Sequence, residues 1–230
     1  MNPFGDVLKA PSPNALRPLL GQTVLAVEDS RFACEAIRLV CLRSGARVRR
    51  ADTISAARRH LAVYRPSVVL VDMGLPDGSG AELIAELAEA SPRVAVLMGT
   101  SGDDAMADAA LAAGADGFLP KPIASITAFQ AAILSHLPPE ERPSGPRAIL
   151  EDEIAPDTIA YHDDLAHALD ALKEGEVAYV GQFLEGVARH AGDDVLVEQA
   201  QQLGLAPEND DLVLQTRGVI KARMGPRVAV

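Results

Sequence analysis

Short apolar runs alternate with amphipathic stretches along the first 137 residues. Runs with the length and the β-branched content of strands lie at 23–27, 48–51, 68–72, 94–98 and 117–119. Apolar residues recur between them at helical spacing, which predicts helices between Ser30 and Gly45 and at 54–63, 81–90, 103–113 and 123–137. Strands that alternate with helices in this way predict an α/β fold with a doubly wound, five-stranded parallel sheet.

The second half of the chain has a different pattern. Residues 138–156 contain five prolines and a dense acidic patch, which is typical of a linker. Apolar positions at helical spacing then predict four short helices at 157–173, 176–191, 194–203 and 210–224. We therefore expect an N-terminal arm at 1–21, an α/β domain at 22–137, a Pro-rich acidic linker at 138–156 and a small all-α region at 157–230.

The charge is distributed unevenly between these parts. The chain of 230 residues has a net charge of −11, of which residues 138–230, with 18 acidic and 8 basic side chains, contribute −10. Such acidity argues against a general nucleic-acid or anionic-membrane binder. Two cysteines, Cys34 and Cys41, are predicted on one helix too far apart for a disulfide, and no run of 18 apolar residues exists. We expect a reduced, cytoplasmic protein without a membrane span.

Polar side chains gather where the predicted strands end. Glu28 and Asp29 follow the first strand, Asp72 ends the third, Thr100 follows the fourth and Lys121 follows the fifth. The carboxyl ends of parallel strands form the edge at which open α/β sheets bind ligands, so these residues should share one crevice. Crowded carboxylates repel each other unless a hard divalent cation lies among them, and Mg²⁺ suits such oxygen ligands.

Four motifs in this order resemble the receiver domain of response regulators, the phospho-acceptor module of two-component signalling. They are VLAVEDS, which contains the acidic pair, VVLVDMGLPDGSG, which contains the acceptor, VAVLMGTS, which contains the switch hydroxyl, and GADGFLPKP, which contains the lysine. The resemblance covers residues 21–137 and implies a flavodoxin-like fold with strand order 2-1-3-4-5. It also implies a phosphorylated signalling protein, and no enzymatic activity beyond self-phosphorylation and self-dephosphorylation.

The resemblance implies a role for each site residue. Asp72 would accept a phosphoryl group from a histidine kinase or a histidine-phosphotransfer protein. Asp29 and Asp72 would bind Mg²⁺ directly, together with the backbone carbonyl of Gly74, and Glu28 would bind it through water. Gly74 itself lacks a side chain that would shield the phosphoryl group.

The remaining roles concern the response to phosphorylation. Lys121 would neutralise a phosphoryl oxygen, Thr100 would move toward another, and Phe118, at the switch aromatic position, would turn inward behind it. Because Phe118 stands where many receivers have Tyr, any contact made by that hydroxyl is lost.

The output of the chain is open to several interpretations. We expect the acidic helical region to signal by protein–protein interaction and to form a homodimer through residues 157–224 that phosphorylation rearranges. A DNA-binding response regulator is an alternative, although within residues 138–230 only four Lys or Arg residues precede the last fifteen positions. Two further alternatives are a phosphotransfer helix that uses His167 and an α/β hydrolase or phosphatase that uses Asp72 as its nucleophile.

Overall fold

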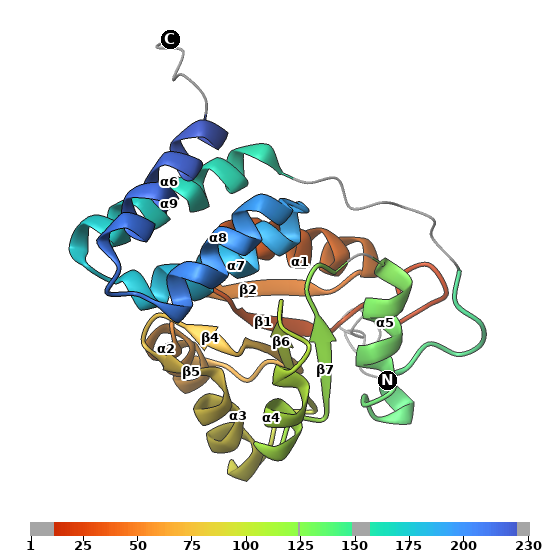
Figure 1. Cartoon of the computed structure of the whole chain (residues 1–230). Helices are drawn as coiled ribbons and strands as arrows, with labels where there is room; N and C mark the ends of the chain where they lie inside the picture. The colour runs from red at the N-terminus through yellow and green to blue at the C-terminus, as the bar shows by residue number, and fades with distance from the viewer. Residues whose placement is uncertain (1–11, 124, 149–156, 225–230) are drawn as a thin grey trace, which may run out of the picture.

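The computed structural model describes residues 12–123, 125–148 and 157–224. Figure 1 shows a sheet flanked by helices, with a bundle of further helices lying beside α1 (Arg31–Ser44). The two parts are connected through residues 149–156, which lie outside the described residues, as do 1–11, 124 and 225–230.

A five-stranded parallel sheet forms the centre of the first part. Its strands are β1 (Thr23–Val27), β2 (Arg47–Ala51), β3 (Val68–Asp72), β6 (Val96–Ser101) and β7 (Gly117–Pro120). They lie in the order β2-β1-β3-β6-β7, which confirms the doubly wound fold. A short hairpin of β4 (Gly74–Leu75) and β5 (Gly78–Ser79) follows β3. The acceptor loop is therefore folded back on itself before the next helix begins.

Helices cover both faces of this sheet. Besides α1, they are α2 (Ile54–Val63), α3 (Gly80–Glu89), α4 (Met106–Ala112) and α5 (Ile126–Leu134). Alternate strand residues serve the two faces: Val68 and Leu70 belong to the core under α1 and α5, whereas Val69 and Val71 belong to the core under α2, α3 and α4. Because every residue of β3 is buried, β3 is apolar throughout until Asp72.

Several element boundaries differ from the sequence-based expectation, most clearly in the fourth strand and in α4 and α5. The fourth strand begins at Val96 and continues to Ser101, because Thr100 still pairs with Asp72 on one side and Leu119 on the other. Helix α4 starts three residues late, since Asp103 forms a turn by accepting a hydrogen bond from the Ala105 amide at 3.0 Å. Helix α5 starts at Ile126 because the Ser125 side chain caps it.

The segments on either side of the α/β domain pack against it. Leu19 in the arm is fully buried, and its amide donates to the Ser44 carbonyl at 2.9 Å. In the first part of the predicted linker, the Arg142 Nε donates to the Leu137 carbonyl at 2.7 Å, and the Ala148 amide donates to the Ala15 carbonyl at 3.0 Å. Residues 138–148 therefore lie along the α/β domain.

The C-terminal part is a four-helix bundle with a core of its own. Its helices are α6 (Thr158–Glu174), α7 (Val177–Ala191), α8 (Asp194–Leu205) and α9 (Asp210–Met224). Leu165, Leu184, Leu196 and Ile220 are fully buried in a cluster that is separate from the two clusters of the sheet. In the described part of the chain, no helix is both long enough and apolar enough to cross a membrane.

Candidate functional site

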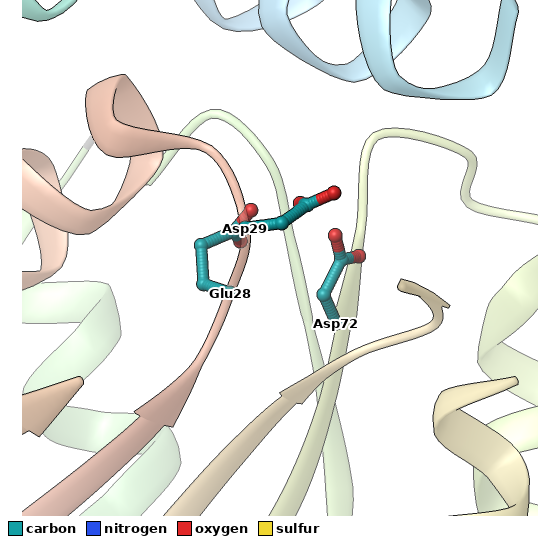
Figure 2. Close-up of side chains that lie close together, drawn as sticks. All are labelled: Glu28, Asp29 and Asp72. Carbon is teal, nitrogen blue, oxygen red and sulfur yellow. The ribbon is translucent and has the colours of Figure 1, made fainter. Parts of the chain in front are cut away.

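Three carboxylates meet at the carboxyl ends of β1 and β3. These strands pair in register, with Val27 beside Val71, so the residues that follow, Glu28 and Asp72, emerge next to each other. Ligand oxygens of Glu28, Asp29 and Asp72 all lie within 4.8 Å of one another. Figure 2 shows the Asp29 and Asp72 carboxyl groups near each other, with the Glu28 side chain beside Asp29. The arrangement is that of a site for a hard cation.

Lys121, directly after β7, supplies positive charge to this cluster. Its Nζ lies 2.8 Å from a Glu28 oxygen and 3.0 Å from an Asp72 oxygen. Only 9% of Lys121, 7% of Asp72 and 1% of Glu28 are exposed, so the three groups form a buried ion triad. One lysine cannot balance three carboxylates when all are ionised, and the site is left with excess negative charge.

The pKa values of the carboxyl groups reflect this excess. Burial raises the pKa of Asp72 to about 7, with Lys121 opposing the rise and Glu28 adding to it. Burial and the neighbouring Asp72 raise the pKa of Asp29 to about 6. A divalent cation among these oxygens would relieve the repulsion, so the residues present fit Mg²⁺.

Thr100 stands beside the acceptor on the neighbouring strand. It is paired with Asp72 across β3 and β6, and it is 2% exposed. Its hydroxyl finds no hydrogen-bond partner among the described residues. A buried hydroxyl without a partner is costly, so this one is suited to a ligand atom that arrives in the site.

Two further predicted residues lie at the edge of the cluster. Gly74 is partly exposed, and its amide lies 3.5 Å from an Asp72 oxygen. Phe118 on β7 is partly buried and packs at the margin of the core under α2, α3 and α4. It pairs in register with Gly99, one residue before Thr100. The structure thus places every predicted site residue around the strand ends.

Several residues that shape this site were not identified from the sequence. Arg50 donates to the Glu28 and Asp29 carbonyls at 3.3 and 2.7 Å, which holds the acidic pair at the end of β1. A Cβ on Gly80 would collide with the backbone carbonyl of Asp72, so only glycine allows α3 to start so close to the acceptor. Asp77 caps α2 by accepting from the Ile54 and Ser55 amides.

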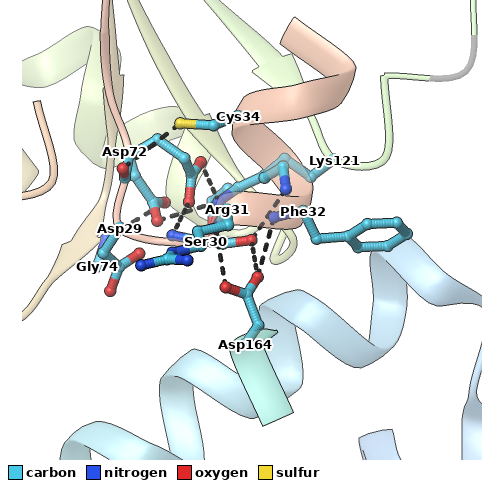
Figure 3. A network of polar contacts seen from close by, with 12 residues as sticks. Asp29, Ser30, Arg31, Phe32, Cys34, Asp72, Gly74, Lys121 and Asp164 are labelled. Atoms are coloured by element: carbon cyan, nitrogen blue, oxygen red, sulfur yellow. Dashed lines mark hydrogen bonds and ion pairs between the residues drawn. The ribbon is translucent and has the colours of Figure 1, made fainter. Parts of the chain in front are cut away.

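The bundle also contributes residues to the site, and the sequence analysis did not identify them. Asp164 on α6 is buried and accepts hydrogen bonds from the Ser30 hydroxyl and from the Arg31 and Phe32 amides (Figure 3). Tyr179 on α7 donates from its hydroxyl to Asp29 at 2.8 Å. The only sequence signal was a carboxylate four residues after Ala160 and four before Ala168, on the buried stripe of α6.

A small cavity lies between the two parts. Its volume is about 90 Å³, and its walls include Asp29, Asp72 and Lys121 from the α/β domain. The other wall is α7, which contributes Gln182 and Phe183 among others. Residues of both parts of the chain therefore line the acidic site.

The histidine and the cysteines considered from the sequence lie near the site without joining it. His167 is exposed, and its Nε2 lies 3.2 Å from the Tyr179 hydroxyl, which itself bonds Asp29. Cys34 and Cys41 are buried and free, and Cys34 Sγ lies 3.6 Å from the Glu28 carbonyl. Burial raises the pKa of the Cys41 thiol to about 12, so this thiol stays protonated.

Comparisons with known proteins agree with this geometry. The family model "Response regulator receiver domain" matches residues 24–133. The KDP operon transcriptional regulatory protein KdpE of Escherichia coli (strain K12) is 34% identical over 99 residues, 43% of this chain and 44% of KdpE. Response regulator MprA of Mycobacterium sp. (strain KMS) is 32% identical over 126 residues, 54% of this chain and 55% of MprA. The chain thus spans about half the length of the curated relatives it matches.

Among solved structures, a putative response regulator from Chloroflexus aurantiacus J-10-fl is similar, with a TM-score of 0.47 and 24% identity. The similarity covers 50% of this chain and 95% of that protein. The family match begins in β1 and ends in α5, so it contains the whole sheet, the three carboxylates, Thr100 and Lys121. Residues 24–133 are therefore a receiver domain of the two-component response regulator family.

Proposed function

We propose that this chain is a two-component response regulator in which Asp72 accepts a phosphoryl group from a phosphohistidine of a histidine kinase or phosphotransfer protein. The supporting observation is the buried cluster in which Asp72 lies beside two other carboxylates, Lys121 and the unpartnered hydroxyl of Thr100. An Asp72 oxygen attacks phosphorus, the P–N bond breaks with its electron pair going to the imidazole, and Asp72 becomes an acyl phosphate.

The other residues of the cluster position and neutralise charge. We propose Mg²⁺ as the cofactor, held by Asp29, Asp72 and the Gly74 carbonyl directly and by Glu28 through water. When bound, the ion supplies positive charge to the phosphoryl oxygens. Lys121, already 3.0 Å from an Asp72 oxygen, pairs with a phosphoryl oxygen in the product.

The switch residues then respond to the new group. The hydroxyl of Thr100 donates to a phosphoryl oxygen and so gains the partner that it lacks among the described residues. Phe118 follows inward, since it already borders the core beside β6.

For the output, we propose protein–protein interaction through the acidic C-terminal bundle. The name of KdpE points to transcriptional regulation as the alternative, but that similarity covers only 43% of this chain. Within the bundle, Arg223 pairs with Asp193 at 2.8 Å and Arg217 donates to the Leu172 carbonyl at 2.8 Å, so both arginines stabilise the fold. A homodimer through residues 157–224 stays a prediction, which sedimentation with and without acetyl phosphate tests.

The phospho-acceptor is tested by incubating the full chain with acetyl phosphate and Mg²⁺ and measuring its intact mass. One phosphoryl mass is expected, and it should be absent in Asp72→Asn. Asp52→Asn serves as a matched control, because Asp52 follows β2 at the same edge of the sheet and is exposed. Labelling that persists in Asp72→Asn contradicts the assignment, and turnover of a generic phosphoester would favour a hydrolase.

A further inference from the structure

The contact between the bundle and the receiver domain is built at the acceptor site itself. Asp164, which is 2% exposed, accepts from the Ser30 hydroxyl at 2.8 Å and from the Arg31 and Phe32 amides at 2.9 and 3.0 Å. These donors form the start of α1, directly after the acidic pair Glu28 and Asp29. A carboxylate also gains there from the positive end of the helix dipole. Figure 3 shows Asp164 reaching from α6 to this turn.

The second contact uses one of the proposed metal ligands. The Tyr179 hydroxyl donates its single hydrogen to Asp29 Oδ2 at 2.8 Å. His167 lies 3.2 Å from the same hydroxyl, and its ring packs on Phe183 with the centroids 5.3 Å apart. Tyr179 therefore holds the Asp29 carboxylate while the bundle is docked.

The third contact fills the space beside the acceptor loop. A Cβ placed on Gly74 would overlap the amide of Gln182, so this side chain occupies the volume that a larger residue at position 74 would take. A Cβ on Gly102 would lie 3.2 Å from the Arg189 side chain. Helix α7 thus touches the loops that follow both β3 and β6.

Helix α7 narrows the space in front of the acidic cluster. The cavity that remains between them measures about 90 Å³. Mg²⁺ normally keeps several waters, and a phosphoryl group brings three further oxygens. Glu185 also lines the cavity, and its carboxylate is paired with Arg189 at 2.7 Å.

We propose that the C-terminal bundle is an intramolecular cover that closes over the acceptor site of the unphosphorylated chain and is released when the site is loaded. Docking and loading compete for the Asp29 carboxylate and for the space beside Gly74 that Gln182 occupies. By linkage, docking of the cover weakens Mg²⁺ binding by the same factor by which bound Mg²⁺ weakens docking, so a variant with a weaker cover should bind Mg²⁺ more tightly. Release by phosphorylation rests on the proposed function, whereas competition with Mg²⁺ requires only the acidic cluster.

Mg²⁺ titration by calorimetry on the full chain tests the competition without any phosphoryl transfer. Tyr179→Phe removes the hydrogen bond to Asp29 but keeps the ring, and we expect Mg²⁺ affinity to rise about fivefold or more. Asp164→Ala should raise it as well. Asp170→Asn is the matched control, because Asp170 is an exposed carboxylate on the same helix, pairs with Lys173 of that helix and should leave the affinity unchanged. Unchanged affinity in Tyr179→Phe overturns the proposal, even if Asp164→Ala fails to fold.

Amide hydrogen exchange tests the release. Adding acetyl phosphate and Mg²⁺ to the wild type should speed exchange at Arg31 and Phe32, whose amides donate to Asp164, while the amides of β3 stay protected. Slow exchange at both amides in a fully labelled chain contradicts the proposal that phosphorylation releases the cover. Labelling of Asp72 should also be faster in Tyr179→Phe than in the wild type. Absence of labelling in every variant would instead contradict the proposed function, while the Mg²⁺ titration still decides the competition.

Discussion

The interactions that stabilise the receiver domain and the bundle internally differ from those that join the two parts. Each has its own buried apolar core, and the cluster of the bundle does not merge with either cluster of the sheet. At the junction, Asp164 and Tyr179 form hydrogen bonds with the start of α1 and with Asp29. Phe32 adds an aromatic contact with His190, with ring centroids 4.6 Å apart. Such a junction can separate while both cores stay folded.

The largest effect is expected from a cavity-creating substitution in only one of the two apolar cores. Leu184 on α7 is fully buried in the bundle, and Leu184→Ala should cost about 2–5 kcal/mol by leaving a cavity. Because the cores are separate, the bundle should unfold first and β3 should keep its exchange protection. Leu205→Ala is the control, since Leu205 is 87% exposed and should change stability by less than about 0.5 kcal/mol. Simultaneous loss of both parts in Leu184→Ala would show one cooperative unit.

The acidic site should make the receiver domain sensitive to pH. Burial raises the pKa of Asp72 from 3.8 to about 7, so the folded chain binds this proton more tightly than the unfolded chain does. The stability that protonation contributes is complete below about pH 4 and is lost as the pH rises through about 7. Thermal unfolding without metal should therefore show a less stable protein at pH 8 than at pH 5.

Asp72→Asn sharpens this test, because the amide stays neutral at every pH. Its stability relative to the wild type should increase between pH 5 and pH 8, and Mg²⁺ at pH 8 should reduce the difference by stabilising the wild type. A difference that does not depend on pH would mean that Asp72 titrates normally.

Replacing either of two buried threonines by valine should change the free energy of unfolding by a smaller amount, with opposite signs. Thr100 has no hydrogen-bond partner among the described residues, so Thr100→Val should stabilise the unphosphorylated chain by about 1 kcal/mol. Thr216 on α9 is equally buried but accepts from Gln199 at 3.1 Å and donates to the Leu212 carbonyl at 2.8 Å. Thr216→Val should therefore destabilise the bundle by a similar amount. Chemical denaturation of both variants measures the contrast, and two changes of the same sign would contradict it.

Much of the acceptor site could be predicted from the sequence because it follows from strand periodicity. Glu28, Asp29, Asp72 and Lys121 each come directly at the end of an apolar run, and parallel strands bring such ends to one edge of the sheet. The helices of the bundle were also predictable: 210–224 matches α9, and the start of α6 follows from its cap at Asp157. Thr100 was expected after its strand but lies within β6, because its neighbours on β3 and β7 extend the pairing.

The sequence by itself determined which residues line the strand ends, since alternation and glycine-rich turns are local properties. Only the tertiary structure decided what faces those residues. Asp164 and Tyr179 lie 134 and 150 positions after Ser30 and Asp29, their hydrogen-bond partners. Helical spacing shows which face of α6 or α7 is apolar, but it does not show which surface a carboxylate or a hydroxyl on that face will meet. That depends on how two separately folded cores pack, and here the packing places the bundle over the acceptor.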